Sequence, residues 1–366
     1  MLNRRTVTIK EVAQAAGVST QTVSRVLNDR PDVSPSTRER VRGVIAALGY
    51  SPNALARSLI RGRSNTLGVV GYGLGYYGPA RILTGVERRA NEMGYSLQLS
   101  LLRRPETNTG ETVFQSLLDR RVDGIIWAVP EIGANREWLA GQIATLSVPV
   151  VAINMQSIAG APMAAIDNRS GGRMATQHLL DQGYRRIGII TGPPTWWEAQ
   201  QRELGWRDAM HAAGIETLED LKVAGDWYPS SGDCGLEQLL ERAPDLEAVF
   251  ACNDPMAVGA LRAARRLGRR VPEDLAVVGF DDVPEAAYYH PALTTVHQPL
   301  VELGGQAVEI LNRRLALQAA GAGPLWPGED QPEQIWLEPQ LIVRDSTLAH
   351  RSDDRPCAAT NSQPPD

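Results

Sequence analysis

The stretch TIKEVAQAAGVSTQTVSRVLN, residues 8–28, decides the fold at the start of the chain. Thr8 and Glu11 have the spacing of a capping box, in which each side chain bonds the other residue's backbone amide, so a helix begins after Thr8. Gly17 suits the left-handed conformation that ends a helix. Ser19 then caps a second helix, which occupies the rest of the stretch. Two short helices around a glycine turn predict a helix-turn-helix.

The second of these helices carries side chains that suit base edges. In a helix-turn-helix the first residues of the second helix face the major groove. Here they are Thr20, Gln21 and Thr22, with Arg25 one turn further on. Glutamine pairs well with adenine and arginine with guanine. A small helical hairpin with incidental polar side chains is the alternative, but the outward face of this helix carries no acidic residue.

A third helix and a short segment follow the helix-turn-helix. Ser34 caps the third helix, which ends at Gly49. Residues 52–63 could form about two helical turns, which are too short to be stable alone in water. We expect this segment to order only against a second copy of the chain and DNA, or else to be a plain linker.

The charge of the chain is divided unevenly. Residues 1–63 hold 11 Lys and Arg against 4 Asp and Glu, a net charge of +7, whereas the rest of the chain has a net charge of −12. A basic head on an acidic body indicates that only the head meets a polyanion, although a solvated basic arm would have the same composition.

Two stretches of the sequence resemble those of a known family. The 8–28 stretch is similar to the head of the lactose-repressor/galactose-repressor (LacI/GalR) regulators, and LGYSPNALARSL, residues 48–59, resembles their hinge helix. The similarity covers nearly all of residues 6–345. It implies two heads on a near-palindromic operator, with paired hinge helices in the minor groove between them.

The resemblance also assigns DNA contacts residue by residue. It implies that Thr20, Gln21 and Arg25 read bases, and that Ala56 and Leu59 enter the minor groove, with Leu59 as a wedge that bends the DNA. Thr20 replaces a tyrosine of the lactose repressor, so the operator sequence should differ. The implied contacts to the DNA backbone are Thr8, Ser19, Thr22, Ser24, Asn28, Ser34, Thr37 and Asn53.

After Thr66 short apolar strands alternate with amphipathic helices, which predicts parallel sheets covered by helices. The fold class is therefore a small all-α helix-turn-helix head plus an α/β body, and the body resembles the two-lobed fold of periplasmic binding proteins. We expect a helix-turn-helix domain at residues 1–51, a hinge at 52–63, a body at 64–346 and a disordered tail at 347–366. Lobe 1 is expected at 64–166 and 296–325 and lobe 2 at 167–295 and 326–346, with crossings near Ile166, Thr295 and Leu325. Residues 334–343 are expected to form one last strand.

Ligands of such sheets bind at the carboxyl ends of the strands. Aromatic and hydrogen-bonding side chains gather there, as a sugar requires, because ring faces stack on its C–H groups while hydroxyls need polar partners. A single tryptophan is more often a core or surface residue, but eight tryptophans beside three phenylalanines favour binding. The candidates are Tyr72, Tyr76, Trp127, Asn154, Trp196, Trp227, Asn253 and Asp281. Asp254 and Asp282 are interpreted instead as helix caps.

The family resemblance adds roles in the same pocket. It implies that Arg202, Asn253 and Asp281 bind sugar hydroxyls and that Trp227 stacks on the sugar. Asn154 stands where the lactose repressor has an aspartate, and Ala128 where it has an asparagine, so the sugar should differ. Trp196 and Trp197 depart from that protein and could stack on a second sugar ring.

The remaining predictions concern assembly and class. The tail lacks the leucine heptads of a tetramer bundle, so a homodimer is expected. No apolar run approaches a membrane span, and no secretory signal is evident, so we expect a cytoplasmic, nucleoid-associated protein. Cys234, Cys252 and Cys357 form neither a disulfide framework nor a metal site, and no cofactor is expected.

The sequence thus predicts a regulator of carbohydrate-utilisation genes, most simply a repressor released by a sugar. A regulator that takes a purine corepressor remains open. A sugar-processing enzyme is disfavoured because the five histidines form no spaced motif and no nucleophile elbow or P-loop occurs. A transport-type binding protein is disfavoured by the basic head.

Overall fold

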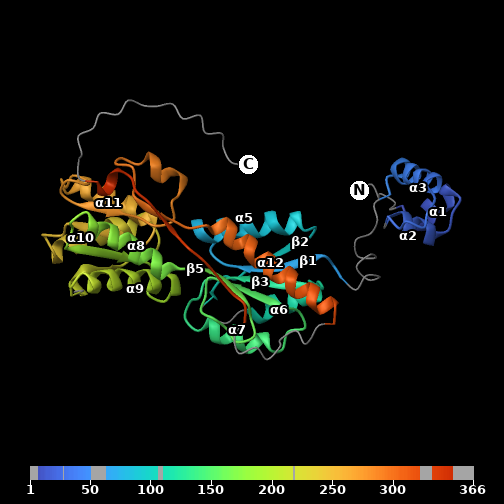
Figure 1. The fold of residues 1–366 in the computed structure, drawn as a ribbon, viewed down its shortest axis with the longest axis horizontal. Helices are drawn as coiled ribbons and strands as arrows, with labels where there is room; N and C mark the ends of the chain where they lie inside the picture. The colour runs from blue at the N-terminus through green and yellow to red at the C-terminus, as the bar shows by residue number, and fades with distance from the viewer. Residues whose placement is uncertain are drawn as a thin grey trace. The chain divides into compact units, whose positions relative to one another are not determined.

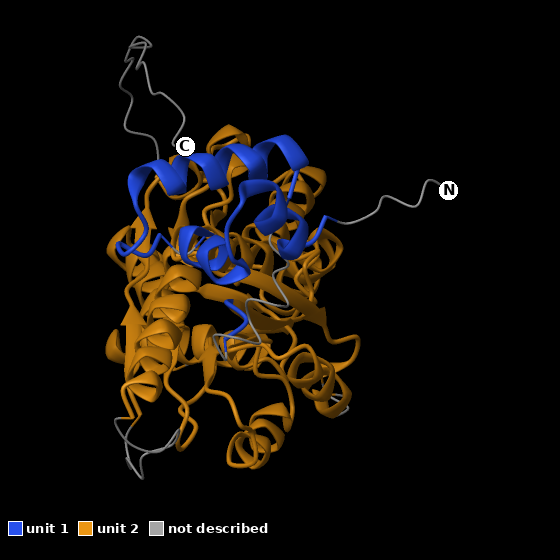
Figure 2. Cartoon of the chain, turned by 90° about the vertical axis from the view of Figure 1, so that its right-hand side faces the viewer, with its two compact units in different colours: residues 1–65 blue, residues 66–366 orange. Residues whose placement is uncertain are grey.

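The computed structural model describes residues 7–27, 29–50, 63–105, 110–216, 219–321 and 332–348. The chain divides into two compact units, residues 1–65 and residues 66–366, which are coloured separately in Figure 2. Each unit has a hydrophobic core of its own, so each is described by itself.

The head consists of three helices, α1 (Ile9–Ala16), α2 (Thr20–Leu27) and α3 (Pro35–Leu48). The capping box at Thr8 is formed in both directions, and Gly17 ends α1 at a φ of 64°. All three helices pack on one another around a small apolar core. That core consists of Val12, Ala13, Ala16, Val23, Val26, Val33 and Val41.

Lobe 1 of the second unit is built on a six-stranded parallel sheet with the strand order β11-β5-β4-β3-β1-β2. Its helices lie around the sheet in the right-hand part of the two-lobed unit in Figure 1. The elements are β1 (Thr66–Gly71), α5 (Tyr77–Glu92), β2 (Ser96–Leu101), α6 (Gly110–Asp119), β3 (Gly124–Ala128), α7 (Asn135–Ile143), β4 (Val150–Ile153), β5 (Met163–Ile166), α12 (Leu300–Ala319) and β11 (Gln334–Leu337).

The two faces of this sheet pack against different helices. Ile126 of β3 belongs to the cluster formed with α5 and α12, whereas Ile125 and Trp127 belong to the cluster formed with α6 and α7. The alternation follows from the pleat, because successive side chains of a strand point to opposite faces. Both faces are covered, so the strands are apolar throughout, as is typical of parallel sheets.

Lobe 2 is built on a four-stranded parallel sheet with the order β7-β6-β8-β9, and a two-stranded antiparallel ladder joins β10 to β12. In this lobe α8 packs against α9, and α10 packs against α11. The elements are α8 (Asn168–Asp181), β6 (Ile187–Thr191), α9 (Trp197–Ala212), β7 (Lys222–Ala224), α10 (Pro229–Arg242), β8 (Ala248–Ala251), α11 (Asp254–Arg266), β9 (Ala276–Val278), β10 (Thr295–His297) and β12 (Gln340–Ile342), with 3-10 turns η2 (Glu219–Leu221), η3 (Pro284–Tyr288) and η4 (Asp345–Thr347).

Within the described residues, the chain crosses between the lobes at three places. The first crossing is at Asp167, next to the expected position, and the second follows β10 at residues 298–299. The prediction of a third crossing near Leu325 is wrong. Strand β11 pairs with β5 in lobe 1, so the chain crosses only at residues 338–339, between β11 and β12. Residues 332–337 therefore belong to lobe 1.

The C-terminal part of the chain also differs from expectation. Residues 334–343 were expected to form one strand, but they form two strands in different sheets, separated at Pro339, which has no amide hydrogen to donate to a ladder. The expected tail from 347 begins too early, because Thr347 is fully buried and its hydroxyl bonds His178 at 2.8 Å. Residues 349–366 lie outside the described part of the chain.

No helix in the described ranges combines the length and the apolar character that crossing a bilayer requires.

Candidate DNA-binding surface and ligand pocket

The side chains predicted to read bases are free of the head's core. Thr20, Gln21 and Arg25 are all exposed on α2. Arg25 lies 3.5 Å from Asp32, and both side chains are about half exposed. An exposed pair of this kind is weak, so Arg25 can exchange Asp32 for a base edge at little cost.

Several residues predicted to contact the DNA backbone lie at helix N-termini. The Ser19 hydroxyl accepts from the Thr22 amide at 3.1 Å and contacts the Thr22 hydroxyl at 2.9 Å. The Ser34 hydroxyl accepts from the Thr37 amide at 3.3 Å, and Thr8 caps α1. Helix N-termini attract anions through free amides and the helix dipole, which suits phosphates. Ser24 is partly exposed. The predicted contacts Asn28, Asn53, Ala56 and Leu59 lie outside the described residues.

The second unit contains a pocket between its two lobes, with about 910 Å³ of empty space that is partly open to solvent. This size fits a small organic ligand. Lobe 1 supplies Gly75, Tyr76, Tyr77, Gly78, Pro79, Ile82, Ala128, Pro130, Ile153, Asn154 and Leu300, lobe 2 supplies Trp196, Glu198, Arg202, Trp227, Tyr228, Pro229, Asn253, Pro255 and Asp281, and Gln298 comes from the second crossing.

Arg202 is the centre of the lobe 2 wall. Its side chain is buried, its Nε donates to Asn168 Oδ1 at 2.8 Å, and one Nη donates to the carbonyl of Cys252. The guanidinium lies over the ring of Phe280 at 3.8 Å from the ring centroid. These contacts hold the side chain in one orientation within the pocket lining, so it needs little further ordering to bind a ligand.

Asp281 lies beside this arginine. One carboxylate oxygen is 3.8 Å from the Arg202 guanidinium and accepts from Gln298 Nε2 at 2.6 Å. Burial raises the pKa of Asp281 to about 6, although the charge of Arg202 and the bond from Gln298 oppose the rise. The arginine and aspartate together offer donors and acceptors side by side, as sugar hydroxyls require.

Asn253 positions the aromatic wall. Its Oδ1 caps α11 by accepting from the Met256 amide at 2.9 Å, and its Nδ2 donates to the Trp227 carbonyl at 3.0 Å. Trp227 has a φ of 75°, which is rare for a bulky residue and is held here by its surroundings. Its ring lies where a side chain on Gly192 would stand, at 2.1 Å from an added Cβ. Gly192 is therefore required for the ring position.

Aromatic rings from both lobes form a continuous group in the pocket. The Trp196 ring centroid lies 5.6 Å from that of Tyr76 and 5.8 Å from that of Trp227, and Tyr76 lies 5.5 Å from Tyr228. Tyr72 is not a lining residue, but its ring centroid lies 6.1 Å from that of Trp196. Each such ring contact stabilises the arrangement beyond the contribution of the apolar area that it buries.

Asn154 lies on the lobe 1 wall at the end of β4. Its φ is 49°, a conformation that asparagine tolerates, and its Oδ1 accepts from the Ile166 amide at 3.0 Å. This bond fixes the direction of Asn154, which is the amide side chain that the described part of lobe 1 contributes to the pocket lining.

The structure contradicts one predicted pocket residue and two predicted caps. Trp127 is fully buried in the core of lobe 1, 5.6 Å from Phe114, so it does not line the pocket. Asp254 does not cap α11; it accepts from Thr295 Oγ1 at 2.6 Å and from the Val283 amide. Asp282 caps no helix either, because its carboxylate pairs with Arg344 at 2.7 Å and with His297 at 3.2 Å. Both aspartates tie lobe 2 to the strands next to the crossings.

The pocket lining also includes residues that the sequence does not single out. Trp197, considered for stacking, is buried against Trp336 instead, whereas Tyr77, Tyr228, Gln298 and Glu198 line the pocket. Glu198 precedes Arg202 by four residues on α9, so the helical period alone could have indicated that both share a face.

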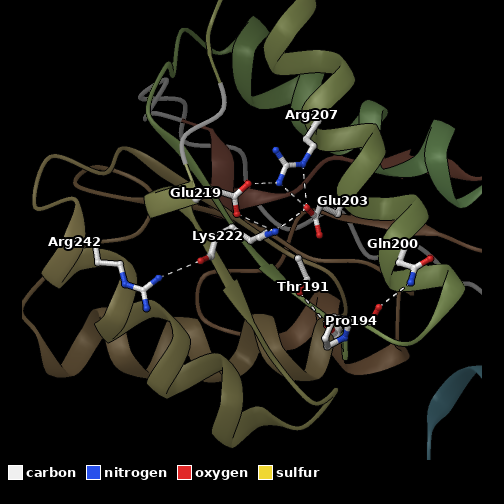
Figure 3. Close-up of polar contacts among 9 residues, drawn as sticks. Thr191, Pro194, Gln200, Glu203, Arg207, Glu219, Lys222 and Arg242 are labelled. Atoms are coloured by element: carbon white, nitrogen blue, oxygen red, sulfur yellow. Dashed lines mark hydrogen bonds and ion pairs between the residues drawn. The ribbon is translucent and has the colours of Figure 1, made fainter. Parts of the chain in front are cut away.

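A network of charges holds α9, which carries Arg202, on the sheet of lobe 2. Glu203 accepts from Lys222 of β7 at 3.1 Å and from Arg207 at 2.8 Å, and Glu219 joins both cations (Figure 3). The network connects helix α9 to the strand that leads to Trp227. It therefore stabilises the relative position of the two sides of the lobe 2 wall.

Two loops next to the pocket-lining residues Pro130 and Trp196 join the lobes directly. The Trp197 amide donates to the carbonyl of Glu131 at 3.0 Å, and the Gly133 amide donates to the carbonyl of Thr195 at 3.3 Å. Residues 131–133 belong to lobe 1 and residues 195–197 to lobe 2, and we call this pair of loops the clasp. In the described ranges no cluster of His, Cys, Asp or Glu has the arrangement of a metal site.

A head with an exposed recognition helix, joined in one chain to a two-lobed unit with a ligand pocket, defines a ligand-responsive DNA-binding regulator. Two family profiles match the chain, one for bacterial regulatory proteins of the lacI family at residues 8–53 and one for a periplasmic binding protein-like domain at residues 176–347.

Whole-chain relatives agree with these profiles. The transcriptional regulator CelR of Thermobifida fusca is 36% identical over 94% of this chain and 100% of its own length. The ribose operon repressor of Escherichia coli K12 is 37% identical over 93% of this chain and 99% of its own.

Two solved structures are similar over the same span. A complex of CelR with cellobiose has 35% identity and a TM-score of 0.67 over 93% of this chain and 99% of its own. A lac repressor dimer bound to operator and the anti-inducer ONPF has 31% identity and a TM-score of 0.83 over 94% of this chain and 100% of its own.

The chain belongs to the LacI family. It is a DNA-binding transcriptional regulator, and the family and fold predictions made from the sequence are confirmed. The family is regulatory, so the prediction of a regulator rather than an enzyme is confirmed as well.

Proposed function

We propose that this regulator is a repressor of carbohydrate-utilisation genes and that a sugar bound between its lobes releases it from DNA. The observation that carries the proposal is the pocket itself. Aromatic rings of Tyr76, Trp196 and Trp227 stand around the buried Arg202–Asp281 pair, so stacking surfaces and hydroxyl partners face one cavity. The complex of a similar regulator with cellobiose supports a sugar as the ligand.

The roles within the pocket follow from chemistry. We assign Arg202, Asp281, Asn253 and Asn154 to sugar hydroxyls and the three rings to stacking, with Tyr72 as support for Trp196. A disaccharide fits this assignment because the rings extend from Trp227 through Trp196 to Tyr76. One sugar ring needs only one or two stacking partners.

On DNA we assign base contacts to Thr20, Gln21 and Arg25 and backbone contacts to the N-termini of the head helices. We assign residues 52–63 to the hinge. Two copies of the chain would bind one near-palindromic operator, since a two-fold dimer matches a two-fold site. The dimeric lac repressor on its operator supports this assembly. Because the target is chromosomal DNA, we assign the protein to the cytoplasm, at the nucleoid.

Ligand binding and DNA binding are coupled through a change in the arrangement of the two lobes. A ligand that contacts both walls favours the closed lobes, and the hinges of the dimer then separate and leave the minor groove. Linkage requires that DNA weaken the binding of an inducer by the same factor by which the inducer weakens DNA binding.

A fluorescence titration tests the proposal. Purified protein is titrated with glucose, ribose, cellobiose and other disaccharides, with and without a duplex that carries a LacI-type palindrome. We expect one sugar to quench tryptophan fluorescence and to lower the affinity for DNA at least tenfold. Purines are titrated in the same way. A purine that strengthens DNA binding, with no effect of any sugar, would overturn the sugar assignment.

A further inference from the structure

The pocket contains one carboxyl group that the proposed roles do not use. Glu198 lines the pocket from the first turn of α9, and its side chain is only 8% exposed. Its Oε2 is buried, and no described residue is its hydrogen-bond partner. Buried carboxylate oxygens without partners are rare because the lost hydration is not replaced.

A hydrogen-bond donor that also lacks a partner belongs to the same pocket lining. Trp227 Nε1 is buried, and it too finds no acceptor among the described residues. An acceptor and a donor that both lack partners are complementary to a hydroxyl group, which can accept one hydrogen bond and donate another. An ether oxygen or an aromatic nitrogen could satisfy only the tryptophan.

The charges of the lining restrict the ligand further. Glu198 and Asp281 are acidic, and Arg202 is the single basic residue of the lining in the described chain. The guanidinium is already engaged by Asn168, the Cys252 carbonyl and Asp281. An anionic ligand would therefore meet one buried carboxylate for which no free cation compensates.

We propose that Glu198 is a specificity-determining residue that binds a hydroxyl of the effector, and that it selects neutral sugars against uronic acids and sugar phosphates. This inference rests on the proposed function, because it names the class of sugar that the pocket accepts.

The state of the carboxyl is consistent with this role. Burial raises the pKa of Glu198 to about 7, while its own backbone amide and the charge of Arg202 oppose the rise. A carboxyl that titrates near neutrality accepts from a hydroxyl when ionised and donates to its oxygen when protonated. A bound carboxylate or phosphate is tolerated only by the protonated form.

The test compares two matched ligand pairs on the full-length protein, glucose with glucuronic acid and cellobiose with cellobiouronic acid. Kd is measured from tryptophan fluorescence at pH 8 for the wild type, Glu198→Gln and Glu241→Gln. Glu241 is exposed on α10 of the same lobe and lies outside the pocket lining, so it controls for the loss of one acidic residue.

We expect the wild type to bind the neutral member of a pair at least 30-fold more tightly than the acidic member. In Glu198→Gln the Kd of the neutral sugar rises about tenfold, and the preference over the acidic sugar falls below about threefold. Glu241→Gln keeps the wild-type preference. Circular dichroism melting establishes that both variants are folded.

The outcomes separate the two proposals. If neutral sugars bind and Glu198→Gln keeps both the affinity and the preference, the inference is wrong while the sugar effector stands. If the wild type binds acidic and neutral members equally, the inference is wrong as well. If no sugar in the panel binds, the proposed effector class fails and the inference fails with it.

Discussion

The two walls of the pocket are chemically different. Among the described residues, the charged side chains of the lining, Glu198, Arg202 and Asp281, all come from lobe 2. Lobe 1 contributes apolar surface and tyrosines, with Asn154 as its amide group. The lobe 2 groups are also the ones held most tightly by their neighbours, as the contacts of Arg202 illustrate.

This difference suggests a division of labour. A ligand gains its directional hydrogen bonds from lobe 2, and it then offers an apolar surface on which lobe 1 closes. Substitutions in lobe 2 should therefore change affinity, while substitutions in lobe 1 should change how strongly the ligand alters DNA binding.

The largest effect is expected for Arg202→Ala. The substitution removes the pocket's cation and leaves Asp281 buried without it, which costs about 3 kcal/mol of folding free energy. Sugar affinity should fall at least 100-fold, while DNA binding remains and no longer responds to sugar. Urea denaturation and fluorescence titration measure the two effects.

Arg169→Ala is the matched control for this prediction. Arg169 forms a bidentate pair with Asp208 on the surface of lobe 2, with half of the arginine exposed, so its loss should cost less than about 1 kcal/mol. Equal losses of sugar affinity in the two variants would contradict the assignment of Arg202 to the ligand.

The next effect concerns lobe 1. Tyr76→Ala removes ring contacts with Trp196 and Tyr228 across the lobes, each of which contributes about 1 kcal/mol. Sugar affinity should fall about tenfold, but the sugar-induced change in DNA affinity should fall further, to less than a third of its wild-type value. An electrophoretic mobility assay at saturating sugar measures this change.

Tyr288→Ala controls for the loss of a tyrosine, because Tyr288 is 88% exposed and lies outside the pocket lining. If Tyr76→Ala lowers affinity but leaves the coupling unchanged at saturation, lobe 1 is only another binding wall and the proposed division fails.

A third prediction concerns pH and the acidic wall of lobe 2. Burial raises the pKa of Glu198 to about 7 and that of Asp281 to about 6, whereas unfolded carboxyls titrate near 4. The folded state therefore takes up protons first as the pH falls, so its stability increases on going from pH 8 to pH 6. We expect a gain of about 1–2 kcal/mol in the free energy of unfolding, measured by urea denaturation without ligand.

The window avoids carboxyls whose pKa is lowered in the folded state, but it includes His178, whose pKa is lowered by burial and which opposes part of the gain. Arginine partners lower the pKa of Asp208 and Asp274, and the stability that these contribute is lost only at more acidic pH. Glu198→Gln should reduce the slope between pH 8 and pH 6, and Glu137→Gln, on the surface of lobe 1, should keep it. A wild-type curve that is flat or falls toward pH 6 would show that these carboxyls are not buried as described.

The head and the pocket differ in how far the sequence could predict them. In the head, Thr8, Gly17, Ser19 and Ser34 each determine a helix end through a local contact, so the sequence locates all three helices. Local contacts of this kind are visible within four residues of chain. The alternation of strands and helices in the body is equally local, and it predicts the parallel sheets.

The pocket depends on contacts between distant segments, which no local pattern shows. Trp127 and Ala128 are neighbours at the end of β3, yet of the two only Ala128 lines the pocket. The sequence could not show which of them does so, because a strand buried on both faces has no polar alternation to indicate its orientation. The ring of Trp227 depends on Gly192, 35 residues earlier. Asp254 was interpreted as a cap because its partner Thr295 is remote in sequence.

The smallest effect is expected at the clasp. Trp336 of lobe 1 is 45% exposed and lies 6.3 Å from the ring of Trp197 in lobe 2, next to the backbone bonds that join the lobes. Trp336→Ala removes a ring contact that favours the closed lobes without touching the pocket lining. Because a ligand binds the closed state, its apparent affinity falls in proportion to the population of that state.

We expect Trp336→Ala to raise the Kd of the sugar two- to threefold and to increase the radius of gyration of the ligand-free protein in small-angle X-ray scattering. Trp336→Phe should restore most of the affinity, because a ring remains at the contact. If the affinity falls while the scattering is unchanged and phenylalanine does not rescue it, Trp336 acts on the sheet of lobe 1 and its contact with Trp197 has no role in the equilibrium between open and closed lobes.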